Sequence, residues 1–142
     1  MPSAEFDLER NLLVRADHDS DIVKFVTELA EKRGITTAVF TAIGALKRGK
    51  LGFYDQEKHE YREITVASPH EMASCTGNIS IKNGKPFVHA HVILADKDGN
   101  TKAGHLFEGI VFAAEIHLCE LRGAKLERRY NKATNLSLWD IK

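Results

Sequence analysis

The sequence predicts an α+β fold, a mainly antiparallel β-sheet with one main amphipathic helix packed on it. Residues 20–33 carry apolar side chains at helical spacing. Most other apolar segments are short and rich in β-branched residues, which favour strands. The turn signals Asn83-Gly84 and Asp98-Gly99 separate such segments at hairpin spacing. With 142 residues, the chain predicts a single domain over residues 1–142 that can bury a core without disulfides or metals.

The elements of the first half follow from local signals. Residues 11–16 predict an opening strand, and residues 17–20 supply turn and capping groups before the helix. The helix is expected to end at Gly34. Its apolar face is formed by Ile22, Phe25, Val26, Leu29 and Ala30. The β-branched residues 35–43 predict a strand, and Gly44 is expected to end it.

Hairpins dominate the rest of the chain. Two apolar segments flank a polar stretch around His59 and predict a first hairpin. Asn83-Gly84 predicts a second hairpin, and Asp98-Gly99 a third. The last long apolar segment is long enough to be a central strand of the sheet. These predicted strands cover residues 51–54, 63–67, 74–81, 86–94 and 109–121.

Composition limits the classes of function. The chain has 20 basic and 20 acidic residues, so it lacks the overall attraction to phosphate of many nucleic-acid-binding proteins. DNA contact would have to come from a local patch. One candidate is residues 47–50, expected to form a basic turn. The other patch consists of Arg122, Lys125, Arg128, Arg129 and Lys132. Charge runs of this size are more often solvated surface.

No targeting or membrane signal is present in the sequence. The N-terminal residues lack the basic start and apolar run of a signal peptide. No apolar run approaches the length needed to span a membrane. We therefore expect a cytoplasmic protein.

Three histidines form the most informative pattern. His89 and His91 alternate along a predicted strand, so both point to the same face, about 7 Å apart. The turn at Asp98-Gly99 is expected to bring His105 back beside them. Three neutral imidazoles leave a tetrahedral Zn²⁺ one open position, as in sites that bind water or a ligand. A single histidine on such a strand is more often a hydrogen-bonded surface or core residue, and the trio favours a metal.

Five short motifs stand out along the chain: Ala42-Ile43-Gly44-Ala45-Leu46, Leu51-Gly52-Phe53-Tyr54-Asp55, Thr76-Gly77-Asn78-Ile79-Ser80, His89-Ala90-His91 and Gly104-His105-Leu106. Together they resemble the plants-and-prokaryotes-conserved domain, or PPC domain. The resemblance covers most of the chain and includes the histidine pattern. It implies a compact domain that assembles as a homotrimer, of the stand-alone prokaryotic type whose members are commonly called DNA-binding proteins. It also implies that His89, His91 and His105 are metal ligands.

The chain departs from the family pattern at two places. Ala103 stands where relatives often have a second glycine, which is expected to alter the turn only modestly. The chain has no AT-hook, and residues 77–81 lack the Arg, Phe and Glu of the plant partner-binding stretch. Plant-type transcription-factor function is therefore not expected.

Two classes of function follow. The first is a trimeric module that binds Zn²⁺ or another divalent transition metal through three histidines and is DNA-associated or regulatory. The alternative is a zinc-dependent hydrolase or lyase acting on a small molecule, because bound Zn²⁺ acidifies water and polarises carbonyls. Glu108 is the acid nearest to His105 in sequence and a candidate general base, and Tyr54 or Glu115 could serve instead. A third possibility is that the histidines bind no metal.

Overall fold

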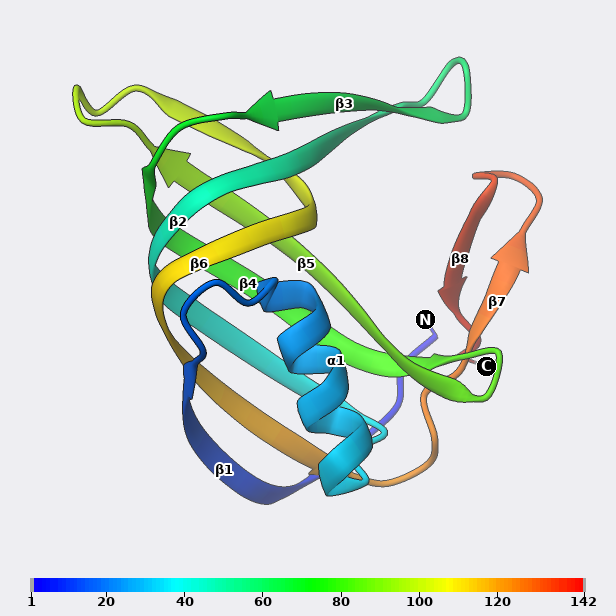
Figure 1. The fold of residues 1–142 in the computed structure, drawn as a ribbon. Coiled ribbons are helices and arrows are strands. Elements are labelled where there is room, and N and C mark those ends of the chain that lie inside the picture. The colour runs from blue at the N-terminus through cyan, green and yellow to red at the C-terminus, as the bar shows by residue number, and fades with distance from the viewer. Residues whose placement is uncertain (1, 142) are drawn as a thin grey trace.

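The computed structural model describes residues 2–141. Over this range the chain forms mostly antiparallel strands and one helix, as the sequence predicts (Figure 1). The elements are β1 (Asp7–Ala16), α1 (Ile22–Arg33), β2 (Ala38–Asp55), β3 (Glu60–Val66), β4 (His70–Lys82), β5 (Lys85–Ala95), β6 (Thr101–Arg122), β7 (Arg128–Asn131) and β8 (Leu136–Trp139).

Two long strands organise the sheet. β2 and β6 pair with each other from Ala38↔Glu120 to Gly52↔His105. On its other side, β2 pairs first with β4 and then with β3. The other side of β6 pairs with β5 near its start and with β1 near its end. Because β4 also pairs with β5, the strands β2, β4, β5 and β6 close into a ring.

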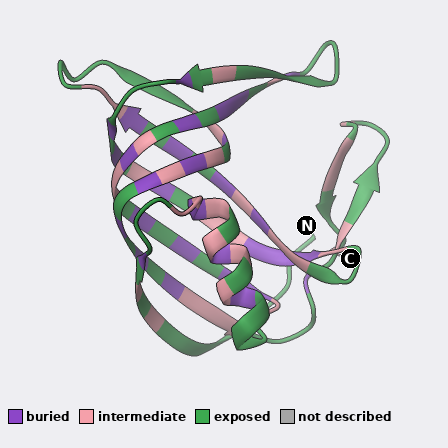
Figure 2. Cartoon of the chain, in the orientation of Figure 1, coloured by how far each residue is buried: buried purple, intermediate pink, exposed green. Residues whose placement is uncertain are grey.

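The segment that leads into α1 fills the gap that β1 and β5 leave along β6, because the Asp19 N–H donates to the Val111 carbonyl and the Val111 N–H to the Ser20 carbonyl, each at 2.9 Å. Asp21 caps α1, since its carboxylate accepts a hydrogen bond from the Val23 N–H at 3.1 Å. The same carboxylate accepts from the Gly109 N–H of β6 at 3.2 Å. One face of α1, formed by Ile22, Val26 and Ala30, is buried in the core (Figure 2). Within the described residues no helix is long and apolar enough to span a membrane.

The prediction that a strand ends at Gly44 is wrong. β2 continues through Gly44, where the register with β4 shifts and the backbone takes a φ of +144°. A Cβ at this position would lie 2.2 Å from the carbonyl oxygen of Ala113 on β6. Glycine here therefore allows close contact between two strands and does not end one. The predicted basic turn over residues 47–50 is also wrong, because β2 continues past Gly44 and these residues lie inside it.

A small hairpin that the sequence analysis did not predict, β7–β8, follows the main sheet. Its base is fixed to the end of β4, because the Ile81 N–H donates to the Leu126 carbonyl at 2.8 Å. Its tip contacts the β2–β3 hairpin, where the Tyr54 hydroxyl donates to the Thr134 carbonyl at 2.6 Å. The hairpin thus spans from β4 to the β2–β3 hairpin (Figure 1).

Candidate metal centre

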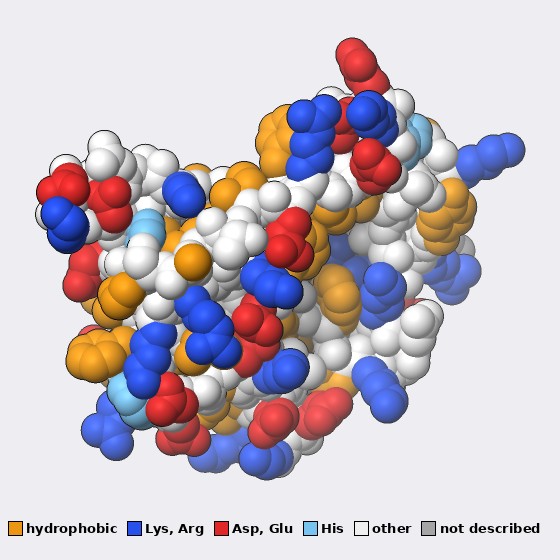
Figure 3. All heavy atoms as spheres, turned by 45° about the horizontal axis from the view of Figure 1, so that its top comes forward, with side chains coloured by type: hydrophobic (Ala, Val, Ile, Leu, Met, Phe, Trp, Pro, Cys, Tyr) orange, Lys and Arg blue, Asp and Glu red, His pale blue; other side chains and the backbone are white. Residues whose placement is uncertain are grey.

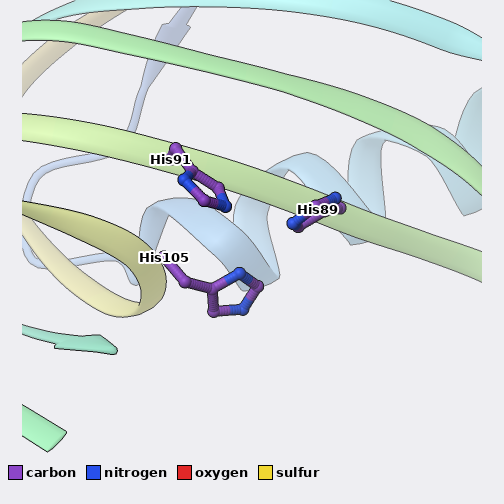
Figure 4. Close-up of side chains that lie close together, drawn as sticks. All are labelled: His89, His91 and His105. Atoms are coloured by element: carbon purple, nitrogen blue, oxygen red, sulfur yellow. The ribbon is translucent and has the colours of Figure 1, made fainter. Parts of the chain in front are cut away.

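The structure brings the three histidines together. His91 of β5 lies directly opposite His105 of β6 in the strand register, and His89 is two residues earlier on the same face of β5. One ring nitrogen from each histidine lies within 4.8 Å of the other two. Figure 4 shows the three imidazoles pointing toward one another from the two strands.

A tight turn sets this register. The Asp96 carboxylate accepts hydrogen bonds from the N–H groups of Asp98 and Asn100, each at 2.9 Å. Gly99 supplies the φ of +82° that the turn requires. β5 and β6 therefore pair only from Ala95↔Thr101 to His91↔His105, after which the strands separate. The histidines lie where they part.

Gly104 allows β2 to approach the strand that carries His105. A Cβ on Gly104 would lie 2.6 Å from the carbonyl oxygen of Gly52. Gly52 is itself the register partner of His105 on β2. On β2 and β3, Gly52 and Tyr61 border the ring of Phe107, which packs edge-on against His105 at 4.8 Å between centroids. The position of the His105 ring is thus fixed from two sides.

The site favours neutral imidazoles, the form that binds metals. Burial lowers the pKa of His89 to about 4, and the Arg128 charge acts in the same direction. Burial also lowers the pKa of His105 to about 4, with the other two rings adding to the effect. His105 Nδ1 is buried and, within residues 2–141, has no hydrogen-bond partner. A cation held among the rings suits this set of nitrogen donors and would stabilise the buried imidazole of His105, whose Nδ1 lacks a partner.

A cavity of about 370 Å³ opens beside the histidines. His89 and His105 form part of its wall, and Arg128 of β7 forms another part. The Arg128 Nη2 atom lies 3.5 Å from His89 Nδ1. The sequence predicts Arg128 only as a member of a basic patch. Its contacts with the distant residues Asn78 and Ser80 on β4 had no local sequence signal.

The three candidate acid–base residues lie apart from the cavity wall. Glu108 is opposite Lys50 in the β2–β6 register and does not line the cavity. Glu115 borders a different hollow, formed by β1, β2 and β6. The Tyr54 hydroxyl is occupied by its hydrogen bond to the hairpin carbonyl, while its ring packs edge-on against Tyr61 at 5.0 Å.

Three members of the basic patches form ion pairs with carboxylates. Lys47 pairs with Asp19 at 2.6 Å, and Arg129 pairs with Asp140 at 2.8 Å. Arg122 pairs with Glu9 at 3.2 Å. In Figure 3 basic and acidic side chains are interspersed over the visible face and do not separate into large fields. This face therefore offers little concentrated positive charge to a phosphate backbone.

Comparisons with known proteins agree with this architecture. A metal-containing protein from Archaeoglobus fulgidus is 42% identical, with a TM-score of 0.95 over 98% of this chain and 99% of that one. A plant- and prokaryote-conserved (PPC) protein from Pyrococcus horikoshii is also 42% identical, with a TM-score of 0.94 over 99% of this chain and 97% of that one.

A more distant structure, a "putative DNA-binding protein" from Bacteroides thetaiotaomicron, is 25% identical, with a TM-score of 0.86 over 95% of this chain and 96% of that one. Among curated proteins, none matches this chain. The model of the Plants and Prokaryotes Conserved (PCC) domain, the PPC domain of the sequence analysis, matches residues 3–122. The chain belongs to this domain family.

Proposed function

We propose that this PPC domain binds one divalent metal ion through His89, His91 and His105. The observation that carries the proposal is the convergence of three imidazole nitrogens within 4.8 Å. The relative from Archaeoglobus fulgidus, named as a metal-containing protein, supports it. Three nitrogen donors with an open fourth position suit Zn²⁺ best, although imidazole also binds other divalent transition metals. Bound there, the ion would act as a Lewis acid toward a ligand in the cavity.

Metal analysis of protein purified without a histidine tag tests the proposal. We expect close to one metal ion per chain, and a loss of affinity of more than about tenfold in His89→Ala and His105→Ala. His59→Asn is the matched control, because His59 is exposed in the β2–β3 turn and its φ of +56° suits asparagine. Equal metal content in the wild type and both alanine variants would exclude the three-histidine site.

We also propose that the domain assembles as a homotrimer, as the family resemblance implies. A hollow of about 540 Å³ on the outer face of β1, β2 and β6 is lined in part by Leu13 and Ile43. These two side chains are 86% and 58% exposed. Such an exposed apolar surface is typical of a face that is covered by another chain.

A small-molecule role is better supported than DNA association. The DNA-binding names of relatives favour the latter, while the interspersed charge of this chain opposes it. A salt-dependent shift of duplex DNA tests DNA association, and absence of a shift at low salt would exclude it. The cavity beside His89 and His105 favours the second candidate, a zinc-dependent hydrolase or lyase. Turnover of small esters, lactones or phosphoesters by metal-loaded protein, lost in His105→Ala, would establish that activity.

A further inference from the structure

We propose that the cavity beside the three histidines binds a small organic carboxylate, and that Arg128 is the residue that recognises its charge. The inference rests on the proposed metal site, because the metal would provide the second attachment point for the ligand. It goes further in naming the class of ligand. It also assigns a binding role to the β7–β8 hairpin, which lies beyond the residues matched by the family model.

The charged side chains on the cavity wall are positive. Two cationic residues, Arg128 and Lys82, border the cavity, and no Asp or Glu of the described chain does. Arg128 is half-buried, and within residues 2–141 it forms no ion pair with a carboxylate. A guanidinium partly removed from water is stabilised by an anionic partner. A metal ion at the histidines would add two further positive charges, so the cavity favours an anion.

Arg128 is held in place in the absence of a ligand. Its Nε atom donates to Ser80 Oγ at 2.7 Å. One terminal nitrogen donates to the Ser137 carbonyl at 3.0 Å, and the other to Asn78 Oδ1 at 2.9 Å. The guanidinium also lies over the rings of Phe87 and Trp139, at 5.3 and 5.7 Å from their centroids.

These contacts leave part of the guanidinium available. An arginine side chain has five N–H groups, and the three hydrogen bonds occupy one on each nitrogen. The second N–H of Nη2 faces His89 Nδ1 at 3.5 Å, the limit of hydrogen bonding, and within residues 2–141 the second N–H of Nη1 has no partner. A carboxylate oxygen can therefore accept from Arg128 without displacing the contacts that fix it. Such preorganisation reduces the entropic cost of binding.

The remaining wall of the cavity is mainly apolar. The aromatic rings of Phe87, Tyr61 and Phe107 border the cavity together with Leu136 and Leu138. A volume of about 370 Å³ is in the range of small-molecule sites, and most of this wall offers no hydrogen bonds. A free inorganic anion would leave it uncovered. The combination therefore favours a ligand with one carboxylate and an apolar body.

Isothermal titration calorimetry on zinc-loaded, full-length protein tests the inference. The probe is 3-phenylpropionate, and its uncharged match is 3-phenylpropionamide. Acetate and inorganic phosphate are two further arms. We expect 3-phenylpropionate to bind more tightly than the amide, acetate and phosphate, by about tenfold or more over the amide. Equal binding of acid and amide would overturn the role of charge. Equal binding of phosphate would overturn the organic character of the ligand.

The variant Arg128→Gln removes the charge from the cavity, and Arg129→Gln is its matched control. Arg129 is on the same strand but pairs with Asp140 at the surface. We expect the first to weaken 3-phenylpropionate binding by about tenfold or more and the second to leave it unchanged. Arg128→Lys keeps the charge but not the planar fork, and we expect intermediate binding. Circular dichroism shows whether Arg128→Gln is folded, and Arg128→Lys provides the test if it is not.

Metal content measured in the same samples separates the two proposals. Zinc bound in the wild type with no preference for the carboxylate overturns the ligand assignment alone. Unaltered affinity in Arg128→Gln, with zinc retained, overturns the role of Arg128. A wild-type protein that binds neither zinc nor another divalent transition metal overturns the proposed metal site and, with it, this inference.

Discussion

Gly104 and His105 are neighbours with opposite requirements. His105 must place a ring among two others, whereas Gly104 must have no side chain at all. The Gly52 carbonyl oxygen would lie 2.6 Å from a Cβ at position 104, and it belongs to the backbone of a paired strand. Relief of this clash requires movement of β2 or β6. The convergence of the histidines therefore depends on a neighbouring residue that has no side chain.

We predict that Gly104→Ala weakens zinc binding and lowers the free energy of unfolding by about 1–3 kcal/mol. The control is Ala103→Gly, which creates the second glycine at an exposed position next to it. We expect that variant to retain its zinc content. Competition with a zinc chelator measures the first effect, and denaturant unfolding measures the second. Wild-type affinity in Gly104→Ala would show that β2 moves without disturbing His105.

The two half-buried histidines predict how the metal-free protein responds to acid. Burial lowers the pKa of both His89 and His105 to about 4, from an ordinary 6.5. Between these values the unfolded chain binds more protons than the folded one, so stability is lost as the pH falls from 6.5 to 4. The charge on Arg128 and the imidazole of His91 contribute to the shift at His89.

Thermal unfolding of chelator-treated protein at pH 7 and at pH 4.5 measures this loss. We expect a larger fall in Tm for the wild type than for the double variant His89→Asn, His105→Asn. The carboxyls whose pKa is lowered, Asp19, Asp55 and Asp96, are present in both proteins. They titrate below their ordinary value of 3.8 and act mainly at lower pH. Equal falls would show that the imidazoles gain no solvent on unfolding.

At the scale of elements, the β7–β8 hairpin completes the cavity. It is attached at its base, where the Ile81 N–H of β4 donates to the Leu126 carbonyl at 2.8 Å. It is attached again at its tip, where Asn135 Nδ2 donates to the His59 carbonyl at 3.2 Å. The position of Arg128 depends on both attachments, because the hairpin has only four residues in each strand.

We predict that Tyr54→Phe loosens the hairpin tip. Loss of the hydrogen bond to Thr134 is expected to lower the free energy of unfolding by about 0.5–1.5 kcal/mol. It is also expected to weaken 3-phenylpropionate binding and leave zinc content unchanged, since the histidines belong to β5 and β6. Tyr130→Phe serves as the control, because its hydroxyl bonds to Asn135 of the same hairpin and, within residues 2–141, to nothing in the β2–β3 hairpin. Loss of zinc in Tyr54→Phe would contradict this division.

Local patterns predicted some elements of this fold and missed others for identifiable reasons. Alternation along β5 places His89 and His91 on one face, and the Asp98-Gly99 turn returns His105, so the histidine cluster was predictable. Gly44 was misinterpreted, because a glycine that ends a strand and one that lets two strands touch have the same local sequence.

The C-terminal hairpin was missed because each of its strands has only four residues, too few for a period of two to be recognised. Arg128 carries the same limitation further. Its partners lie 48 and 50 residues away on β4, so its placement is a tertiary event that spacing does not encode. Position in a basic run therefore predicted a solvent-exposed surface role, while the structure turns this one member of the run inward.

At the scale of the whole molecule, the exposed Leu13 and Ile43 side chains in the hollow on β1, β2 and β6 predict self-association. We expect sedimentation equilibrium of the wild type to give the mass of a trimer. Leu13→Glu places a charge in the hollow and is expected to shift the mass toward that of a single chain. Tyr130→Glu, at a side chain that is 66% exposed on the hairpin, should leave the mass unchanged. A wild-type monomer would refute the trimer.

The boundary of the family match divides the residues around the cavity into two groups. The ring of strands and all three histidines lie within residues 3–122, whereas the charged and apolar wall contributed by β7 and β8 lies after them. If the proposed metal and ligand sites are both correct, mutations in this short tail are expected to change ligand preference and to leave the histidine centre intact. Exchange of the tail is then a route by which the same domain acquires new ligands.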